Sequence, residues 1–361
     1  MAEVKGKKHK VKNSRCEEND AVWIAQEKFF PVYFLKKVGQ LVLSLLVLSV
    51  LVFFISRLAP GEPLRAFYGD AVERMGPEQL AAARDRLGLD ETLFVQYWNW
   101  LTGALTGDFG ISFQYKQDVL SVVGKVSFNT LILTLVSFML IFVLGLLLAV
   151  FCVMREDKAA DRIIRRLGVA ANSVPEFLTA LLFMFIFSVS LGLLPSSGAY
   201  SIGQSGNIAD RALHLVLPVA AIVFSHLWYC AYLMRNKLSD EIRKEYVLLC
   251  RVKGLSEREI LFKHCLKNIM PAIVSIMAVF LPHLLGGTYI VEMVFSYPGL
   301  GTLGFESAQY HDYNMLMVIA LITGFFVITA NMLAQAVNEK LDPRMRYGER
   351  ISVKAGGEGG E

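Results

Sequence analysis

The sequence lacks the motifs by which many enzymes are recognised. It has no G-x-x-x-x-G-K-[ST] loop for nucleotide phosphates, no G-x-S-x-G nucleophile turn and no H-E-x-x-H metal motif. The five cysteines show no C-x-x-C spacing, which argues against a zinc site or a disulfide framework. We therefore expect no catalytic residues, no bound cofactor and no metal in this chain. Energy for any work must come from another polypeptide or from an ion gradient.

Charged residues are also scarce. They make up 19% of the 361 residues, against about 25% in an ordinary soluble domain. The net charge of +4 is too small to indicate nucleic acid as a partner. The apolar residues, 54% of the chain, are concentrated in long runs.

Six of these runs are long enough to cross a bilayer, which takes roughly 20 apolar residues in a helix. Inside lipid the backbone must satisfy its own hydrogen bonds, so each run is predicted to be a helix. The sequence therefore predicts an all-α membrane protein with six transmembrane helices. The predicted spans lie at about 35–58, 128–154, 168–194, 213–235, 270–294 and 315–337.

The distribution of Lys and Arg predicts the orientation. These residues gather in segments 1–37, 155–167, 235–269 and 338–361, whereas segment 295–314 has none. By the positive-inside rule, both termini are predicted to face the cytoplasm. Residues 1–34 read as a charged N-terminal tail and residues 348–361 as a flexible C-terminal tail, on either side of a membrane domain over 35–347.

Two long segments between the spans hold most of the remaining sequence. Segment 59–126 is predicted to lie outside, as a packing element or as a docking surface for a solute-delivery protein. Segment 236–269, the coupling loop, is predicted to lie inside. A helix over 239–253 should end at Gly254, where a side chain would clash, and Ser256 with Glu259 should form the capping box of a second helix. Apolar side chains with a charged rim are typical of a docking element.

The stretch EYVLLCRVKGLSEREILFKHCLKNIMPAIV, residues 245–274, resembles the cytoplasmic coupling motif of ABC importer permeases. Within them it is most similar to the dipeptide, oligopeptide and nickel permease family, of the first permease subunit type. Further motifs carry the same resemblance in the family's order. They are PGEP at 60–63, LGLDETLFVQY at 87–97, GDFGIS at 107–112, EMVFSYPGLGTL at 292–303 and LDPRMR at 341–346.

This resemblance implies a type I ABC importer permease fold in the bacterial inner membrane. It further implies a second homologous permease, two ATPase subunits that bind ATP and magnesium, and an extracytoplasmic solute-binding protein. The transported solute would be a di- or oligopeptide, nickel or another small solute. The residues implied to couple to the ATPases are Glu245, Tyr246, Arg251, Lys253, Gly254, Leu255 and His264.

Three polar residues near the predicted outer ends of two spans are candidates for the translocation path or its gate. Glu292 is costly in a span unless it is paired or hydrated. It is either a gate residue or a carboxylate hydrogen-bonded at the outer interface. Asn129 and Thr130 either line a polar route or bridge helices.

Three other classes of protein fit the sequence less well. An ion-coupled secondary transporter without ATPases would show paired intramembrane carboxylates or broken-helix repeats, and only Glu292 is a candidate. An intramembrane enzyme would need a nucleophile and a base, and no such set is recognisable. A helix-turn-helix DNA reader is disfavoured because the coupling loop is tethered to the bilayer at both ends.

Overall fold

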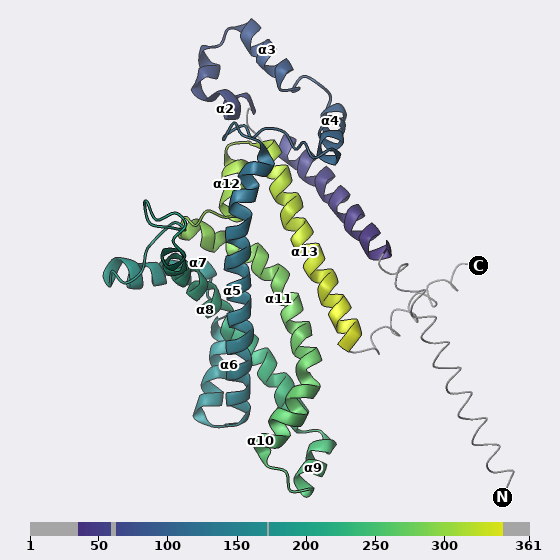
Figure 1. Ribbon diagram of the computed structural model, residues 1–361, viewed down its shortest axis with the longest axis vertical. Helices are drawn as coiled ribbons and strands as arrows, with labels where there is room; N and C mark the ends of the chain where they lie inside the picture. Colours follow the sequence, from purple (N-terminus) through teal and green to yellow (C-terminus); the bar gives the residue numbers. More distant parts are fainter. Residues whose placement is uncertain (1–34, 59–62, 172, 342–361) are drawn as a thin grey trace, which may run out of the picture. The chain divides into compact units, whose positions relative to one another are not determined.

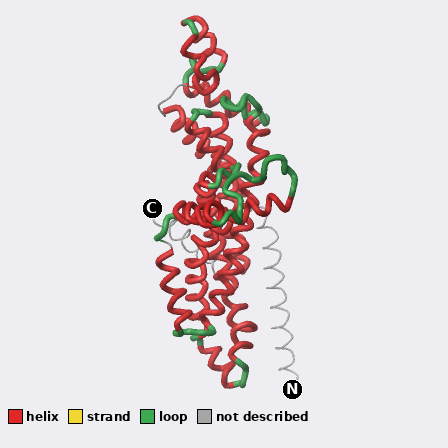
Figure 2. The backbone as a smooth tube through the Cα atoms, turned by 90° about the vertical axis from the view of Figure 1, so that its left-hand side faces the viewer, coloured by secondary structure: helices red, strands yellow, loops and turns green. Residues whose placement is uncertain are grey.

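A computed structural model describes residues 35–58, 63–171 and 173–341. Over these ranges, all the regular secondary structure elements are helices (Figure 2). The tails predicted at 1–34 and 348–361 lie outside the described residues. So do most of the PGEP and LDPRMR motifs. Contacts divide the chain into residues 1–48 and residues 49–361, and everything below on packing concerns the second unit.

Within the described ranges, five helices are long and apolar enough to cross a membrane. They are the helix Leu35–Leu58, α5 (Val119–Val153), α8 (Ile208–Ile242), the continuous helix Glu257–Val294 and α13 (Tyr313–Leu341). Each of them covers one of the predicted spans, except that α5 ends at Val153, one residue before the predicted end of the second span. At about 1.5 Å per residue, the 35 residues of α5 or α8 exceed a hydrocarbon core of about 30 Å, so their ends extend beyond it.

The third predicted span, 168–194, differs from a single helix. It is divided between the end of α6 (Ala159–Ala171), α7 (Glu176–Phe183) and a π-helical turn (Met184–Ser190). The two parts are bent by 108°, and together they make a sixth candidate span. Pro175 directly precedes α7, where a missing N–H costs nothing, and a proline there disfavours a helical residue before it.

Helix α8 is the centre of the packing, since it lies against α5, α6, α7 and α11 (Leu266–Val294) (Figure 1). Glycines let these helices approach. A Cβ on Gly168 of α6 would lie 2.7 Å from the Cβ of Tyr232 on α8. The core between them is apolar, with fully buried side chains such as Leu133, Ile141 and Met234.

Shorter helices occupy the two ends of this packed unit. Toward the beginning of α5 lie α2 (Pro63–Tyr68), a 3-10 turn (Gly69–Arg74), α3 (Pro77–Arg86), α4 (Leu93–Leu105) and α12 (Leu300–Gln309). At the other end, α9 (Glu245–Val252) and α10 (Glu257–Glu259) form the tip of the coupling loop, and the π-helical turn Ile260–Cys265 joins α10 to α11 (Figure 1).

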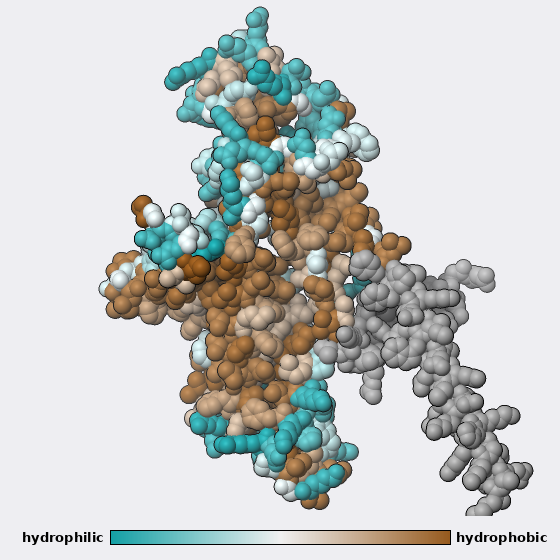
Figure 3. Space-filling model, viewed as in Figure 1, coloured by the Kyte–Doolittle hydropathy of each residue, from teal (hydrophilic) through white to brown (hydrophobic). Residues whose placement is uncertain are grey.

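On the face drawn in Figure 3, apolar side chains cover most of the flanks of the long helices, and polar side chains gather at both ends. Helix α5 exposes an apolar stripe that includes Leu140, Val143 and Leu147. Exposed apolar surface of this extent is unfavourable in water but suits lipid or a partner subunit. The structure is thus an all-helical, multi-pass membrane protein.

Candidate functional site

The coupling loop contains two short helices, as predicted, but the first is shorter than expected. Residues 239–242 are the last residues of α8, and the helix is interrupted at Lys244, whose backbone is extended. Helix α9 begins at Glu245. Ser256 caps α10 as predicted, because its hydroxyl oxygen accepts a hydrogen bond from the backbone N–H of Glu259 at 3.3 Å.

Gly254 is needed for a different reason from the one predicted. A Cβ added to Gly254 would meet no atom within 4 Å, so a clash does not explain it. Its φ is +80°, in the left-handed region that favours glycine. The Leu255 N–H donates to the carbonyl of Cys250, and the Gly254 N–H to the carbonyl of Arg251, which closes the end of α9. The backbone conformation of the turn, rather than space, requires glycine.

One face of the loop is anchored on the chain itself. Val247, Ile260 and Leu261 are buried. The Tyr246 hydroxyl donates to Glu241 at the end of α8, with 2.8 Å between the oxygens, and burial raises the pKa of Tyr246. This face therefore ties α9 to both α8 and the helix that continues into α11.

The opposite face of α9 is open and apolar. Leu248 is 63% exposed, Leu249 59% and Val252 81%. Beside them, Arg251 donates to both carboxylate oxygens of Glu257, at 2.7 and 3.1 Å, and this pairing raises the pKa of the guanidinium. Exposed apolar side chains with a charged rim have the composition of an interface with another protein.

The residues predicted to couple to ATPases divide between the two faces. Glu245, Arg251, Lys253 and Gly254 are exposed, whereas Tyr246, Leu255 and His264 are partly buried. None of the three exposed apolar side chains of α9 is among the coupling residues that the resemblance implied.

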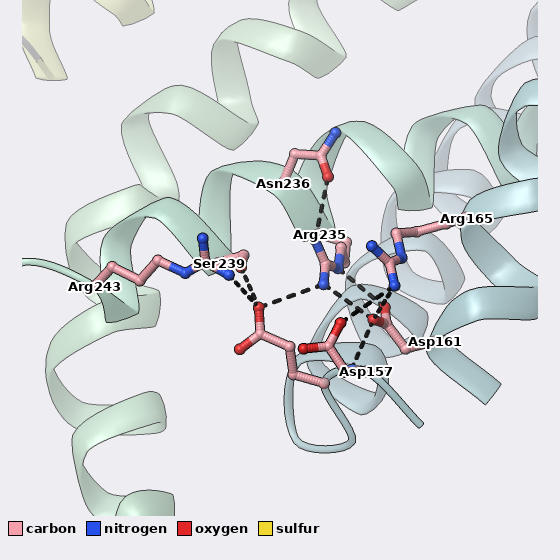
Figure 4. Close-up of polar contacts among 8 residues, drawn as sticks. Asp157, Asp161, Arg165, Arg235, Asn236, Ser239 and Arg243 are labelled. Atoms are coloured by element: carbon pink, nitrogen blue, oxygen red, sulfur yellow. Dashed lines mark hydrogen bonds and ion pairs between the residues drawn. The ribbon is translucent and has the colours of Figure 1, made fainter. Parts of the chain in front are cut away.

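A buried ion network holds α6 against α8 near this loop, and the sequence analysis missed it. Asp161 of α6 is fully buried and accepts two hydrogen bonds from Arg235 of α8, both at 3.0 Å (Figure 4). Arg165 lies 3.3 Å from the same carboxylate. The i, i+4 spacing of Asp161 and Arg165 on a helix could have indicated that pair. No local sequence pattern indicates that either residue contacts Arg235.

The network continues into the coupling loop. Glu156 accepts hydrogen bonds from Ser239 at 2.8 Å and from Arg243 at 2.9 Å. The Ser239 hydroxyl, together with Arg243, lowers the pKa of Glu156. Arg243 directly follows Ile242, the last residue of α8, so the turn between α5 and α6 is bonded to the short connection between α8 and α9.

The three residues proposed for a path or gate meet at one place, where α12 begins. The fully buried Glu292 carboxylate accepts hydrogen bonds from the Thr130 hydroxyl at 2.6 Å and from the N–H groups of Gly301 and Thr302 at 2.8 and 3.3 Å. Free N–H groups and the helix dipole at the start of α12 favour a negative charge there. A Cβ on Gly301 would lie 2.5 Å from the Cα of Tyr289 and 2.8 Å from a Glu292 oxygen, so this position needs glycine.

Asn129 extends the same cluster to α8. Its side-chain amide donates to the carbonyl of Pro298 at 2.7 Å and accepts from Arg211 at 2.7 Å. Arg211 also donates to the Tyr200 hydroxyl at 3.1 Å. The polar side chains of Glu292, Asn129 and Thr130 thus all have hydrogen-bond partners within the chain. Their role on the translocation path stays a prediction.

The GDFGIS motif has a structural partner in segment 311–314. The Ser112 hydroxyl donates to the buried Asp312 carboxylate, and the Gln114 N–H donates to it at 3.2 Å. The Asn314 amide donates to the Ile111 carbonyl at 3.0 Å. The motif therefore fastens the segment before α5 to the turn between α12 and α13.

Comparison with known proteins places these features in a family. Residues 31–134 match the model of the N-terminal part of the binding-protein-dependent transport system membrane component, and residues 141–347 match the model of the binding-protein-dependent transport system inner membrane component. The chain belongs to this family. It is a permease subunit of an ABC importer and spans the inner membrane several times. Membership decides against a secondary transporter and implies further permease, ATPase and binding-protein components.

Two relatives, permeases for an oligopeptide and for glutathione by their names, agree with this assignment. The chain is 29% identical over 317 residues to the oligopeptide transport system permease protein AppB of Bacillus subtilis (strain 168), with 87% of this chain and 99% of the relative covered. It is 32% identical over 315 residues, with the same coverage, to the glutathione transport system permease protein GsiC of Salmonella choleraesuis (strain SC-B67). A solved structure of the MetNI methionine ABC transporter in an inward-facing conformation matches with a TM-score of 0.48 and 20% identity, over 60% of this chain and 97% of the other.

Proposed function

We propose that this permease pairs with a second, homologous permease to enclose a path for di- or oligopeptides or a chemically similar small solute. Two relatives are named as permeases for oligopeptides and for glutathione, which is itself a peptide. A solute-binding protein would deliver the cargo at the α12 end. Two ATPase subunits, which bind ATP and magnesium, would act at the other end, on the coupling loop.

The exposed apolar face of α9 is the observation that carries this proposal. Leu248, Leu249 and Val252 have no cover in the described part of the chain, although the other face of the same helix is buried. A cytoplasmic partner that covers this face would remove three large apolar side chains from water, and each fully buried side chain of this size is worth about 1.5–3 kcal/mol. The apolar face is where an ATPase would bind.

The anchored face explains how movement would reach the membrane. The loop contacts the end of α8 through the bond between Tyr246 and Glu241, and it continues without interruption into α11. A displacement of α9 by closing ATPases would therefore act on two transmembrane helices together. Alternating access would follow from the relative movement of these helices.

The test is the variant Leu249→Asp in the full transporter. A charge at this position would be costly to bury, so we expect the ATPases to co-purify at least about tenfold less and ATP-driven uptake to fall in proportion. The measurements are ATPase recovery with a tagged permease and solute uptake into proteoliposomes. Leu105→Asp is the matched control, because Leu105 is 79% exposed at the end of α4, away from the loop. Full ATPase recovery with Leu249→Asp would refute the proposal.

A further inference from the structure

A group of ionisable side chains lies within the membrane-spanning part of the chain, apart from the sites described above. His226 lies near the middle of α8, Glu176 is the first residue of α7, and His283 lies on α11. The His226 Nε2 lies 3.7 Å from a Glu176 carboxylate oxygen, and the His226 and His283 rings are 5.8 Å apart between centroids. Three helices thus bring these groups together, although the residues are far apart in the sequence.

The Glu176 carboxylate lies directly against α11. A Cβ on Gly287 would be 3.3 Å from a Glu176 oxygen, so the glycine provides the room for this approach. Within the described residues, neither the second Glu176 oxygen nor the His226 Nε2 has a hydrogen-bond partner, and both atoms are buried. His226 is the single side chain of the described ranges that lies within ion-pair distance of Glu176. The carboxylate is therefore not neutralised by any lysine or arginine there.

His283 belongs to an open stripe on α11. Four exposed residues follow one another at helical spacing on this helix: Val279, His283, Gly286 and Ile290. The exposed stripe on α5, by contrast, is wholly apolar around Val143 and Leu147. Ionisable groups inside a membrane are costly against lipid, and they face a water-filled cavity or the interior of a bundle. The α5 stripe can therefore face lipid, whereas the α11 stripe, which contains an ionisable side chain, requires water or protein beside it.

We propose that the α11 stripe around His283 lines the aqueous translocation path, and that Glu176 behind it attracts the protonated amino group of the passing solute. This inference rests on the proposed function, since it requires a path. A carboxylate can only accept hydrogen bonds, and in a low-dielectric surrounding its field reaches further than in water. Oligopeptides and glutathione, the cargoes in the names of the two relatives, both carry a free amino group.

Thiol labelling of His283→Cys in membranes that contain the complete transporter tests the first part. The probes are a cationic trimethylammonium-ethyl and an anionic sulfonatoethyl methanethiosulfonate, and the rates are taken above those of the chain with its native cysteines alone. We expect both probes to react, because the stripe faces water. Leu147→Cys is the matched control on α5 and should not react. Absence of reaction at position 283 would mean that lipid or the second permease covers the stripe, which would overturn the proposal.

The role of Glu176 is tested by the preference between the two probes. With Glu176 present, the cation should react faster than the anion. In Glu176→Gln we expect the ratio of the two rates to fall about fivefold, because the carboxylate charge is lost at unchanged shape. Glu176→Asp should keep the preference, and Glu78→Gln, on the exposed surface of α3, should not change it. A ratio that is equal in Glu176→Gln and in the parent would contradict the electrostatic role.

The solute's amino group is tested by protection. Tri-alanine at millimolar concentration should slow the labelling of His283→Cys, whereas N-acetyl-tri-alanine, which lacks the charge, should not. Equal protection by both peptides, or by neither, would contradict recognition of the amino group. These measurements need neither ATP nor uptake, so they can fail while Leu249→Asp still shows the coupling role of the loop, and the reverse also holds.

Discussion

At the scale of single residues, backbone conformation and hydrogen bonding explain the positions that the sequence marks most clearly. Gly254 has a left-handed backbone and open space around it. Glu292 is a buried carboxylate that accepts hydrogen bonds from N–H groups at the start of α12. Position 254 requires glycine because of its φ angle. Position 301, which contacts Glu292, requires glycine because no space is left there for a side chain.

The Gly254 turn gives a prediction that separates conformation from space. In the purified permease, Gly254→Ala and Gly254→Trp should destabilise the turn to a similar degree, by about 1–2 kcal/mol, because any L side chain is strained at this φ. Gly254→Asn should cost clearly less, since asparagine tolerates the left-handed region. Hydrogen–deuterium exchange of the loop amides measures this. A much larger effect of Trp than of Ala would show that space, and not conformation, requires the glycine.

At the scale of elements, the ion network determines how α6 lies on α8. Asp161 is completely buried, and Arg235 is nearly so, with 9% of its side chain exposed. Removing one partner of a buried ion pair leaves a charge without compensation and typically costs about 3–5 kcal/mol, while an apolar replacement of both partners is often nearly neutral. The network therefore fixes the geometry of α6 more than it adds to stability.

Thermal unfolding in detergent can check this statement. Asp161→Leu alone should lower the Tm strongly, and Asp161→Leu combined with Arg235→Met should recover much of the loss. Glu73→Gln is a matched control, because Glu73 pairs with Arg65 at the surface and such exposed pairs contribute about 0–1 kcal/mol. A double variant as unstable as the single one would show that the ion pair itself stabilises the fold.

Sequence reasoning predicted the elements that depend on local information. Apolar runs located five long helices, and the Gly254 turn and the Ser256 cap were recognisable because their signals lie within a few residues. The break between α6 and α7 was not predicted, because an apolar run shows no bend and residues 168–194 therefore read as a single span. The bond between Asp161 and Arg235 joins residues 74 positions apart, and the cluster of Glu176, His226 and His283 joins three helices. Such pairs depend on packing, which no local pattern contains.

At the scale of the whole molecule, the two ends of the helices differ in structure, and we propose that they serve different components of the importer. The α12 end combines the Glu292 cluster with the Ser112 and Asp312 contact, and the loop end combines the ion network with the open face of α9. That the loop end lies in the cytoplasm follows from the distribution of Lys and Arg, and it stays a prediction.

Labelling from one side of the membrane tests this orientation. Val252→Cys, 81% exposed on α9, should react with an impermeant thiol reagent only in inside-out vesicles. Ile202→Cys, which is fully exposed in segment 195–212, should react only in intact cells. Both substitutions use exposed positions, whereas native Cys265 is buried and would report poorly. Reaction of Val252→Cys in intact cells would place the coupling loop outside and remove the basis for an ATPase partner.

The π-helical turn Ile260–Cys265 has a consequence for how α11 responds to its neighbours. A π turn holds one residue more than an α turn needs, and it sits where the loop enters the membrane helix. If this additional residue became part of a regular α-helix, α11 would rotate by about 100° around its own axis. A small shift of the loop along the helix axis would then change which side chains of α11 face the proposed path at the depth of His283.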